Sequence, residues 1–226
     1  QQIYDRYKGP SEGAPASYIP ELAKADPNAF AIALVAADGQ KYVVGQSDHL
    51  FSMQSTSKPF SYGMALQEYG RDFMLSKIGV EPTGEAFNSI VELEKQTHRP
   101  YNPMINSGAI VVSGLIKGSD LADRQRNVLE HFSRYLGHSP KIDERIYESE
   151  RKTAHRNRSI AHLLRHFNVL EHDIDDTLDI YFKQCSILVS TLDLATMAGT
   201  LANRGRSPFT QAVALEKEYV GDMLSL

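Results

Sequence analysis

The most informative stretch of the sequence is Gln54-Ser55-Thr56-Ser57-Lys58, which is followed directly by Pro59. It places a hydroxyl and an amine three residues apart. Positions three apart share one face of a helix, so the spacing predicts that Ser55 Oγ and Lys58 Nζ meet. A serine hydroxyl is a weak nucleophile unless a base lies beside it, and a desolvated lysine is such a base. Ser-x-x-Lys is one form of this pair in acyl-transfer enzymes, although many matches are helix starts with a capping serine and a solvated lysine.

The composition is that of an ordinary globular chain. The sequence has 226 residues, of which 42% are hydrophobic and 23% charged, with a net charge of −4 and no basic run. Nucleic acid is therefore not expected as a partner. No apolar stretch is long enough to span a membrane, and residues 1–6 do not resemble a signal peptide. The single cysteine, Cys185, excludes an internal disulfide and fits a cytoplasmic location. The histidines show no metal-ligand spacing, and no metal site is predicted.

Local patterns predict a hairpin followed by helices. Residues 31–35 and 41–44 are apolar runs separated by Asp38-Gly39, which is a strong hairpin signal. A short helix is expected over residues 18–23 and a longer one over 59–69, which Gly70 would end.

The rest of the chain is predicted to be mainly helical. Residues 121–136 and 160–167 each place apolar side chains on one helical face. Ser190-Thr191-Leu192-Asp193 resembles a capping box and would open a helix through Leu201. Residues 207–226 read as a loop and then a helix-like segment from Ala212, so no run of strands closes the sheet. The sequence predicts one domain over 1–226, with a helical lobe at roughly 65–180.

Several motifs together resemble the bacterial-type glutaminases, which are serine-dependent relatives of β-lactamases and penicillin-binding proteins. The resemblance covers nearly the whole chain from about Ile3. The motifs, in order, are Tyr18-Ile19-Pro20-Glu21-Leu22-Ala23, Phe51-Ser52-Met53-Gln54-Ser55-Thr56-Ser57-Lys58, Gly79-Val80-Glu81-Pro82-Thr83-Gly84, Asn102-Pro103-Met104-Ile105-Asn106-Ser107-Gly108-Ala109-Ile110, Ser149-Glu150-Arg151 with Arg156-Asn157, and Tyr181-Phe182-Lys183-Gln184-Cys185-Ser186-Ile187.

This resemblance implies an α+β, serine β-lactamase-like fold, in which an antiparallel sheet packs with helices beside a mainly helical lobe. It implies hydrolysis of L-glutamine to L-glutamate and ammonia without a metal or organic cofactor. Ser55 matches the family nucleophile and Lys58 the base that accepts its proton. Lys58 must be neutral for this role, so its pKa must be lowered. Tyr181 matches a site tyrosine that binds substrate and relays a proton toward the leaving ammonia.

The same matching implies a set of substrate contacts. Glu150 is the expected partner of the α-ammonium, and Asn106 and Asn157 match further contacts. An asparagine amide both donates and accepts hydrogen bonds, which suits a zwitterion. Tyr18 and Gln54 flank the site in the same way. The family also implies self-association into a dimer or a tetramer.

Each of these residues also has a simpler structural interpretation. Asn106 could cap a helix, and Asn102 could be only a turn residue. The other three fit ordinary environments: Glu150 a solvated charged face, Asn157 plain surface, and Tyr181 the core. Cys185 fits a small buried hydrophobic residue. The resemblance, rather than the spacing, favours the functional interpretation.

The sequence also departs from the family pattern. The family continues with a glycine-rich segment, a second site tyrosine and a Lys-Ser-Gly box on a strand, none of which is present; Lys117-Gly118-Ser119 has the wrong order. Loss of one oxyanion donor costs about a hundred- to a thousandfold in rate. Two alternatives to an active glutaminase therefore stay open. One is a truncated, impaired member that only binds partners, and the other is a related acyl-serine hydrolase acting on β-lactams or D-alanyl peptides.

Overall fold

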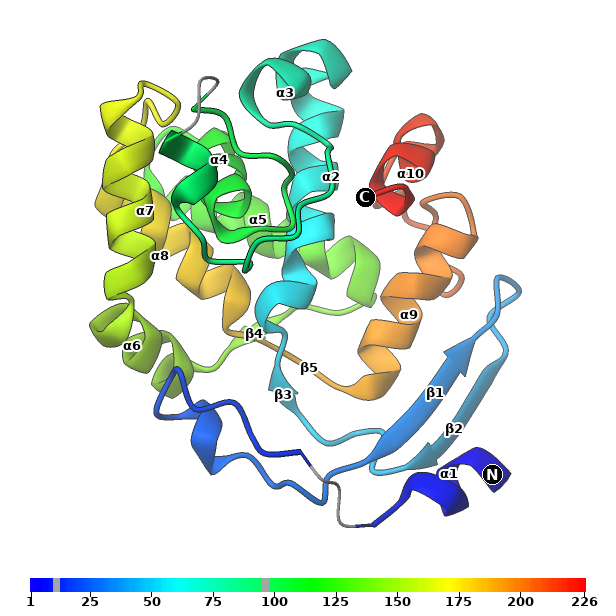
Figure 1. Cartoon of the computed structure of the whole chain (residues 1–226). Coiled ribbons are helices and arrows are strands. Elements are labelled where there is room, and N and C mark those ends of the chain that lie inside the picture. The colour runs from blue at the N-terminus through cyan, green and yellow to red at the C-terminus, as the bar shows by residue number, and fades with distance from the viewer. Residues whose placement is uncertain (10–12, 95–97) are drawn as a thin grey trace.

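The computed structural model describes residues 1–9, 13–94 and 98–226. Most of the helices gather on one side of the molecule, and the β-hairpin lies at its edge with the N-terminal helix beside it (Figure 1). In chain order the elements are α1 (Gln2–Tyr7), η1 (Leu22–Lys24), β1 (Ala31–Val35), β2 (Lys41–Gly45), β3 (Phe51–Ser52), η2 (Gln54–Ser57), α2 (Lys58–Tyr69), α3 (Arg71–Lys77), η3 (Val91–Glu94), α4 (Asn106–Leu115), α5 (Leu121–Leu136), β4 (Lys141–Ile142), α6 (Glu144–Thr153), α7 (His155–His166), α8 (Ile174–Cys185), β5 (Ile187–Val189), α9 (Thr191–Ala202) and α10 (Lys217–Leu224).

The predicted hairpin is confirmed. Strands β1 and β2 pair antiparallel, with Val35 opposite Lys41. The turn is closed by a hydrogen bond from Gly39 N to Ala36 O of 2.9 Å, so Ala37 and Asp38 occupy its centre. Gly39 follows with a φ of +89°, a left-handed conformation that favours glycine. The Asp-Gly signal thus marked the turn one residue too late.

A second, three-stranded sheet joins parts of the chain that the sequence analysis did not identify as strands. Its order is β3-β5-β4, and both pairings are antiparallel. Each strand has only two or three residues, which is too short for an alternating pattern to be read. This sheet positions two segments: β3 leads into the turn that carries Ser55, and β5 directly follows α8. The hydrogen bond from Met53 N to Ile187 O, 2.8 Å long, continues this contact.

Local signals set the ends of the main helices, and the capping box of α9 and the Gly70 end of α2 are as predicted. Asp120 caps α5 by accepting from Asp123 N at 2.8 Å, and Gly137 ends it in a left-handed conformation. At α9 the capping box is present in both directions, because Ser190 and Asp193 each accept from the other's backbone N–H. Helix α2 ends at Gly70, as expected.

Two predicted helices differ from the observed elements. The expected helix over residues 18–23 is a single 3₁₀ turn, η1, which begins only at Leu22. The helix-like segment from Ala212 forms a helix only from Lys217, because residues 205–215 make a loop tied back on itself. In this loop Ala214 N donates to Gly205 O at 2.9 Å.

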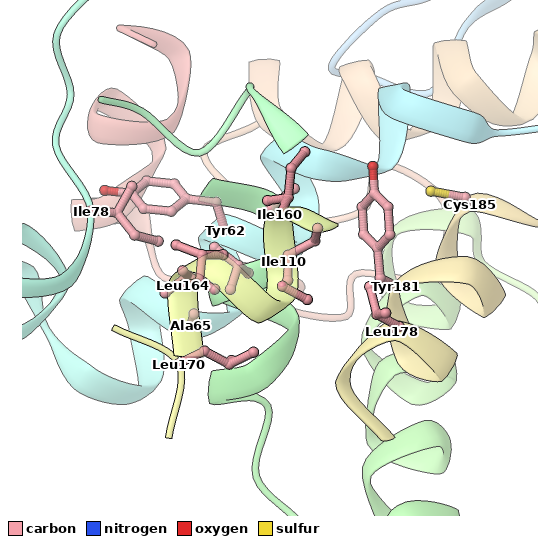
Figure 2. Packing of buried hydrophobic residues seen from close by; sticks show 14 of the residues in the cluster. Tyr62, Ala65, Ile78, Ile110, Ile160, Leu164, Leu170, Leu178, Tyr181 and Cys185 are labelled. Carbon is pink, nitrogen blue, oxygen red and sulfur yellow. The ribbon is translucent and has the colours of Figure 1, made fainter. Parts of the chain in front are cut away.

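Two clusters of buried side chains make up the core. The first lies among α2, α4, α7 and α8, and Figure 2 labels ten of its members, including Tyr181 and Cys185 on α8. The second lies among α5, β5, α9 and α10 and contains Phe132, Met197 and Leu215. Ile142 and Tyr219 pack against both clusters, so the two are continuous. In the described parts of the chain no helix is long and apolar enough to cross a membrane.

Candidate active site

Ser55 lies on the 3₁₀ turn η2, between strand β3 and helix α2. The residue before it, Gln54, has a φ of 49°, a conformation that is uncommon for a residue with a side chain. The Gln54 amide is held on both sides: Nε2 donates to Ser52 Oγ at 3.1 Å and to Cys185 O at 3.3 Å, and Oε1 accepts from the Tyr18 hydroxyl at 3.4 Å. These bonds fix the strained turn and leave Ser55 exposed at the surface of the site.

Lys58, the first residue of α2, turns its amine into the protein. Its Nζ donates to Met104 O at 2.9 Å and to Asn106 Oδ1 at 2.7 Å, and the residue is only 3% exposed. Ser55 Oγ is not among the hydrogen-bond partners of Lys58 in the described residues, so the direct contact predicted from the spacing is not formed here. Burial lowers the pKa of Lys58 to about 8, the direction that a lysine base requires.

Asn106 connects three of the predicted residues. Its Oδ1 accepts from Lys58 and, at 3.4 Å, from the Tyr181 hydroxyl, while its Nδ2 donates to Asn157 Oδ1 at 2.9 Å. Asn106 is the first residue of α4, but its side chain makes none of the capping bonds that the simpler interpretation implied. Asn102 is the turn residue instead, since its Oδ1 accepts from Met104 N and Ile105 N.

Glu150, on α6, is buried rather than solvated. It is 5% exposed, and Oε2 has no hydrogen-bond partner among the described residues. Burial raises the pKa of this carboxyl to about 8, against the opposing effect of the Lys58 charge. An ionised carboxylate here is costly unless a cation pairs with it. The residue is therefore poised to receive a positively charged ligand group.

Tyr181 and Cys185 add neutral side chains to the site. Burial raises the pKa of the Tyr181 phenol and of the Cys185 thiol well above their ordinary values. Tyr181 is 3% and Cys185 2% exposed, so Cys185 is a small buried side chain, as the simpler interpretation held. Asn157 is half-buried rather than plain surface.

These side chains line one cavity of about 200 Å³. Seven of the residues proposed from the sequence border it: Tyr18, Gln54, Ser55, Asn106, Glu150, Asn157 and Tyr181. Lys58 is connected to the cavity through its hydrogen bond to Asn106. Sequence reasoning missed Phe87, Asn88 and Arg156, which also line the cavity. Arg156 Nε donates to Asn88 O at 2.9 Å and so joins α7 to the loop before α4. In the sequence, only the position of Arg156 next to Asn157 indicates that Arg156 lies at the site.

Comparison with protein families shows which family the chain belongs to. A family model described as Glutaminase matches residues 13–226. The chain belongs to the glutaminase family. It is 50% identical over 224 residues to a glutaminase of Trichormus variabilis, covering 99% of the chain and 67% of that relative. It is 46% identical over 224 residues to a glutaminase of Microcystis aeruginosa, covering 99% of the chain and 66% of that relative.

Solved structures of glutaminases share this fold. One described as probable glutaminase ybaS superposes with a TM-score of 0.96 at 34% identity, covering 99% of the chain and 72% of that structure. Another, described as Mglu in its glutamate form, gives a TM-score of 0.93 at 36% identity, covering 99% of the chain and 52% of that structure. The predicted α+β, serine β-lactamase-like fold and the prediction of a glutaminase-type amidohydrolase are therefore confirmed, and the β-lactam alternative gains no support. The chain spans about two thirds of the length of the curated relatives it matches.

The described residues contain no group of three or more His, Cys, Asp or Glu side chains placed to hold a metal ion. The cofactor-free reaction remains a prediction from the family resemblance.

Proposed function

We propose that the protein hydrolyses L-glutamine to L-glutamate and ammonia at this cavity, with Ser55 as nucleophile. Ser55 Oγ attacks the side-chain amide carbon, ammonia leaves, and water then hydrolyses the resulting glutamyl ester. The observation that carries the proposal is the buried Lys58–Asn106 hydrogen bond. It joins a lysine of lowered pKa to Asn106, which lines the same cavity as Ser55 and Glu150.

Lys58 and Tyr181 divide the proton transfers in this proposal. In its neutral form Lys58 accepts the proton of Ser55 once its amine has moved away from Met104 O. Burial keeps the Tyr181 hydroxyl protonated before the reaction. In the proposed step it gives this proton to the leaving nitrogen and regains one from the Lys58 ammonium, the group that received the proton of Ser55; Lys58 and Tyr181 both donate to Asn106 Oδ1.

The two ends of the substrate are recognised separately. The α-ammonium pairs with Glu150, whose Oε2 otherwise lacks a partner. Asn106, Asn157, Tyr18 and Gln54 supply the donors and acceptors for the remaining polar groups. Amides without the α-ammonium leave Glu150 unpaired and are rejected, because an unpaired buried polar group costs about 1–3 kcal/mol or more. A related structure is described as Mglu in its glutamate form, which supports binding of the product by a protein of this fold.

An ammonia-release assay on the full protein with L-glutamine tests the proposal. Ser55→Ala is expected to lower kcat by a factor on the order of 10⁴–10⁶, the range typical of a lost serine nucleophile. Thr56→Ala is the matched control, since Thr56 is the next hydroxyl of the same turn but donates to Met53 O. Unchanged activity in Ser55→Ala would refute Ser55 as the nucleophile. Labelling of Ser55 by a fluorescent β-lactam would favour the related acyl-serine hydrolase instead.

Two other predictions concern assembly and location. Self-association into a dimer or tetramer follows only from the family resemblance. The cytoplasmic location rests on the single cysteine.

A further inference from the structure

A second cavity, of about 180 Å³, lies between α5, β4 and a different face of α8 from the one that carries Tyr181 and Cys185. Four aliphatic side chains form much of its wall: Val128, Leu129, Ile142 and Ile180. An apolar cavity of about 150 Å³ accommodates a benzene-sized molecule, so this one has room for about seven non-hydrogen atoms.

One polar side chain in the wall of this cavity, Gln184, has a partner for its amide oxygen but none among the described residues for its amide nitrogen. Gln184 is 1% exposed, and its Oε1 accepts from Ser61 Oγ at 2.9 Å. Its Nε2 is buried and has no acceptor among the described residues. A buried amide nitrogen without a partner is unfavourable, and native proteins usually supply one. The missing partner is an acceptor, since an amide NH₂ only donates.

The charges around the cavity indicate that this acceptor is uncharged. Among the described residues that line the cavity Lys183 is the one cation, and its Nζ already lies 3.5 Å from Asp179 Oδ2. Glu144 adds a carboxylate at the same wall. A carboxylate ligand would therefore be desolvated beside a net negative charge without a free counter-ion, which is unfavourable.

We propose that the cavity between α5, β4 and α8 binds a small uncharged carbonyl compound with an aliphatic group. Its oxygen accepts a hydrogen bond from Gln184 Nε2, and its alkyl group packs on Leu129, Ile142 and Ile180. The Gln184 amide then has both of its hydrogen-bonding groups satisfied. The site adjoins the catalytic region without being part of it, because Ser61, which Gln184 holds, lies one helical turn after Lys58 on α2.

The test is a titration of the full protein with 4-methyl-2-pentanone, followed by methyl NMR of the isoleucine and leucine side chains. We expect saturable shifts at Ile142, Ile180 and Leu129, with a dissociation constant on the order of 1–10 mM for so small a ligand. The carboxylate of similar shape, 3-methylbutanoate, should bind at least about tenfold more weakly.

Two variants assign the interaction to its atoms. Gln184→Met keeps the shape of the side chain but removes the donor, and should weaken ketone binding by up to about tenfold. Leu129→Phe fills the cavity and should abolish binding while leaving Gln184 in place. Leu121→Phe is its matched control, because Leu121 is also half-buried on α5 but lies outside the cavity wall, and it should bind the ketone normally.

Three results would overturn the proposal. Absence of saturable shifts would mean that the cavity holds only water. Equal affinity for the ketone and 3-methylbutanoate would exclude selection for an uncharged group. Equal ketone affinity in the unaltered protein and in Gln184→Met, or in Leu129→Phe, would remove Gln184 or this cavity from the interaction.

Discussion

Burial shifts the pKa values of Glu150 and Lys58 in opposite directions. Burial lowers the pKa of Lys58 to about 8 and raises that of Glu150 to about 8. Below this pH Lys58 is charged and Glu150 neutral, so the lysine cannot accept a proton and the carboxyl cannot pair with an ammonium. Above it both groups reach the states that the proposed reaction needs.

The first prediction concerns the pH dependence of turnover. We expect kcat/KM for glutamine to rise as pH increases through about 8, more steeply than for one ionisation, because both residues must lose a proton. Glu150→Gln should leave a shallower rise that reflects Lys58 alone. Initial rates of ammonia release across the range measure both profiles. A profile that is flat through pH 8 would contradict the assignment of Lys58 as the base.

The second prediction concerns the loss of stability that the buried carboxyl group of Glu150 causes. The folded-state pKa, about 8, lies above the ordinary value of 4.5, so between these values the folded protein keeps a proton that the unfolded chain has lost. The free energy of unfolding therefore falls as pH rises through this window. Glu150→Gln removes this loss, and its melting temperature should exceed that of the unaltered protein above pH 8 by several degrees, about what 1–2 kcal/mol gives.

Glu148→Gln is the control for this stability effect. Glu148 lies on the same helix, but its side chain is 41% exposed and pairs with Arg151 at the surface, so its replacement should change the melting temperature little at any pH. KM for glutamine should rise in Glu150→Gln and not in Glu148→Gln. Equal pH dependence of melting in the two variants would show that Glu150 is not the group responsible.

At the scale of elements, the loop before α4 is held against the first turn of that helix at Gly108. A Cβ at this position would lie 2.1 Å from Asn102 O and 2.9 Å from Pro103 Cα, so the backbone itself leaves no room. The same loop presents Met104 O to Lys58. Gly108 thus connects close packing of the backbone to the position of the Lys58 amine, the proposed base.

The third prediction follows from this contact. Gly108→Ala should lower the free energy of unfolding by about 1–3 kcal/mol and reduce kcat, because the loop must move and carry Met104 O with it. Gly221→Ala is the matched control, since Gly221 lies in α10 with open space around its Cβ position, and it should stabilise by up to about 1 kcal/mol. Denaturant unfolding and the ammonia assay measure the two effects. A Gly108→Ala variant with unaltered stability would contradict the packing described here.

What the sequence predicts well at this scale is local. The hairpin, the ends of α5 and the capping box of α9 follow from residues a few positions apart. The sequence does not predict β4 and β5, because strands this short are defined by their partners rather than by their own pattern. The direction of the Asn106 side chain was likewise decided by Lys58, 48 positions earlier in the chain. Only the family resemblance, which compares whole motifs, could bring such distant residues together beforehand.

At the scale of the whole molecule, the two buried clusters share Ile142 and Tyr219 and are joined by helices α2 and α8. The site depends mainly on the first cluster, to which Tyr181 and Cys185 belong, whereas Phe132 lies at 0% exposure in the second. Because the clusters are continuous, loss of packing in one should also destabilise the other. This continuity supports the sequence-based prediction of a single domain without testing it.

The fourth prediction tests whether the two clusters unfold together. Phe132→Ala should cost about 3–5 kcal/mol, because it empties a large site that the rings of Phe60 and His131 border. In one cooperative unit the loss of helix, followed by circular dichroism, and the loss of glutamate binding, followed on the same heating ramp, should shift together to one lower midpoint. If helix content fell first while binding persisted to the original temperature, the second cluster would be a separate folding unit, and the single-domain prediction would be wrong.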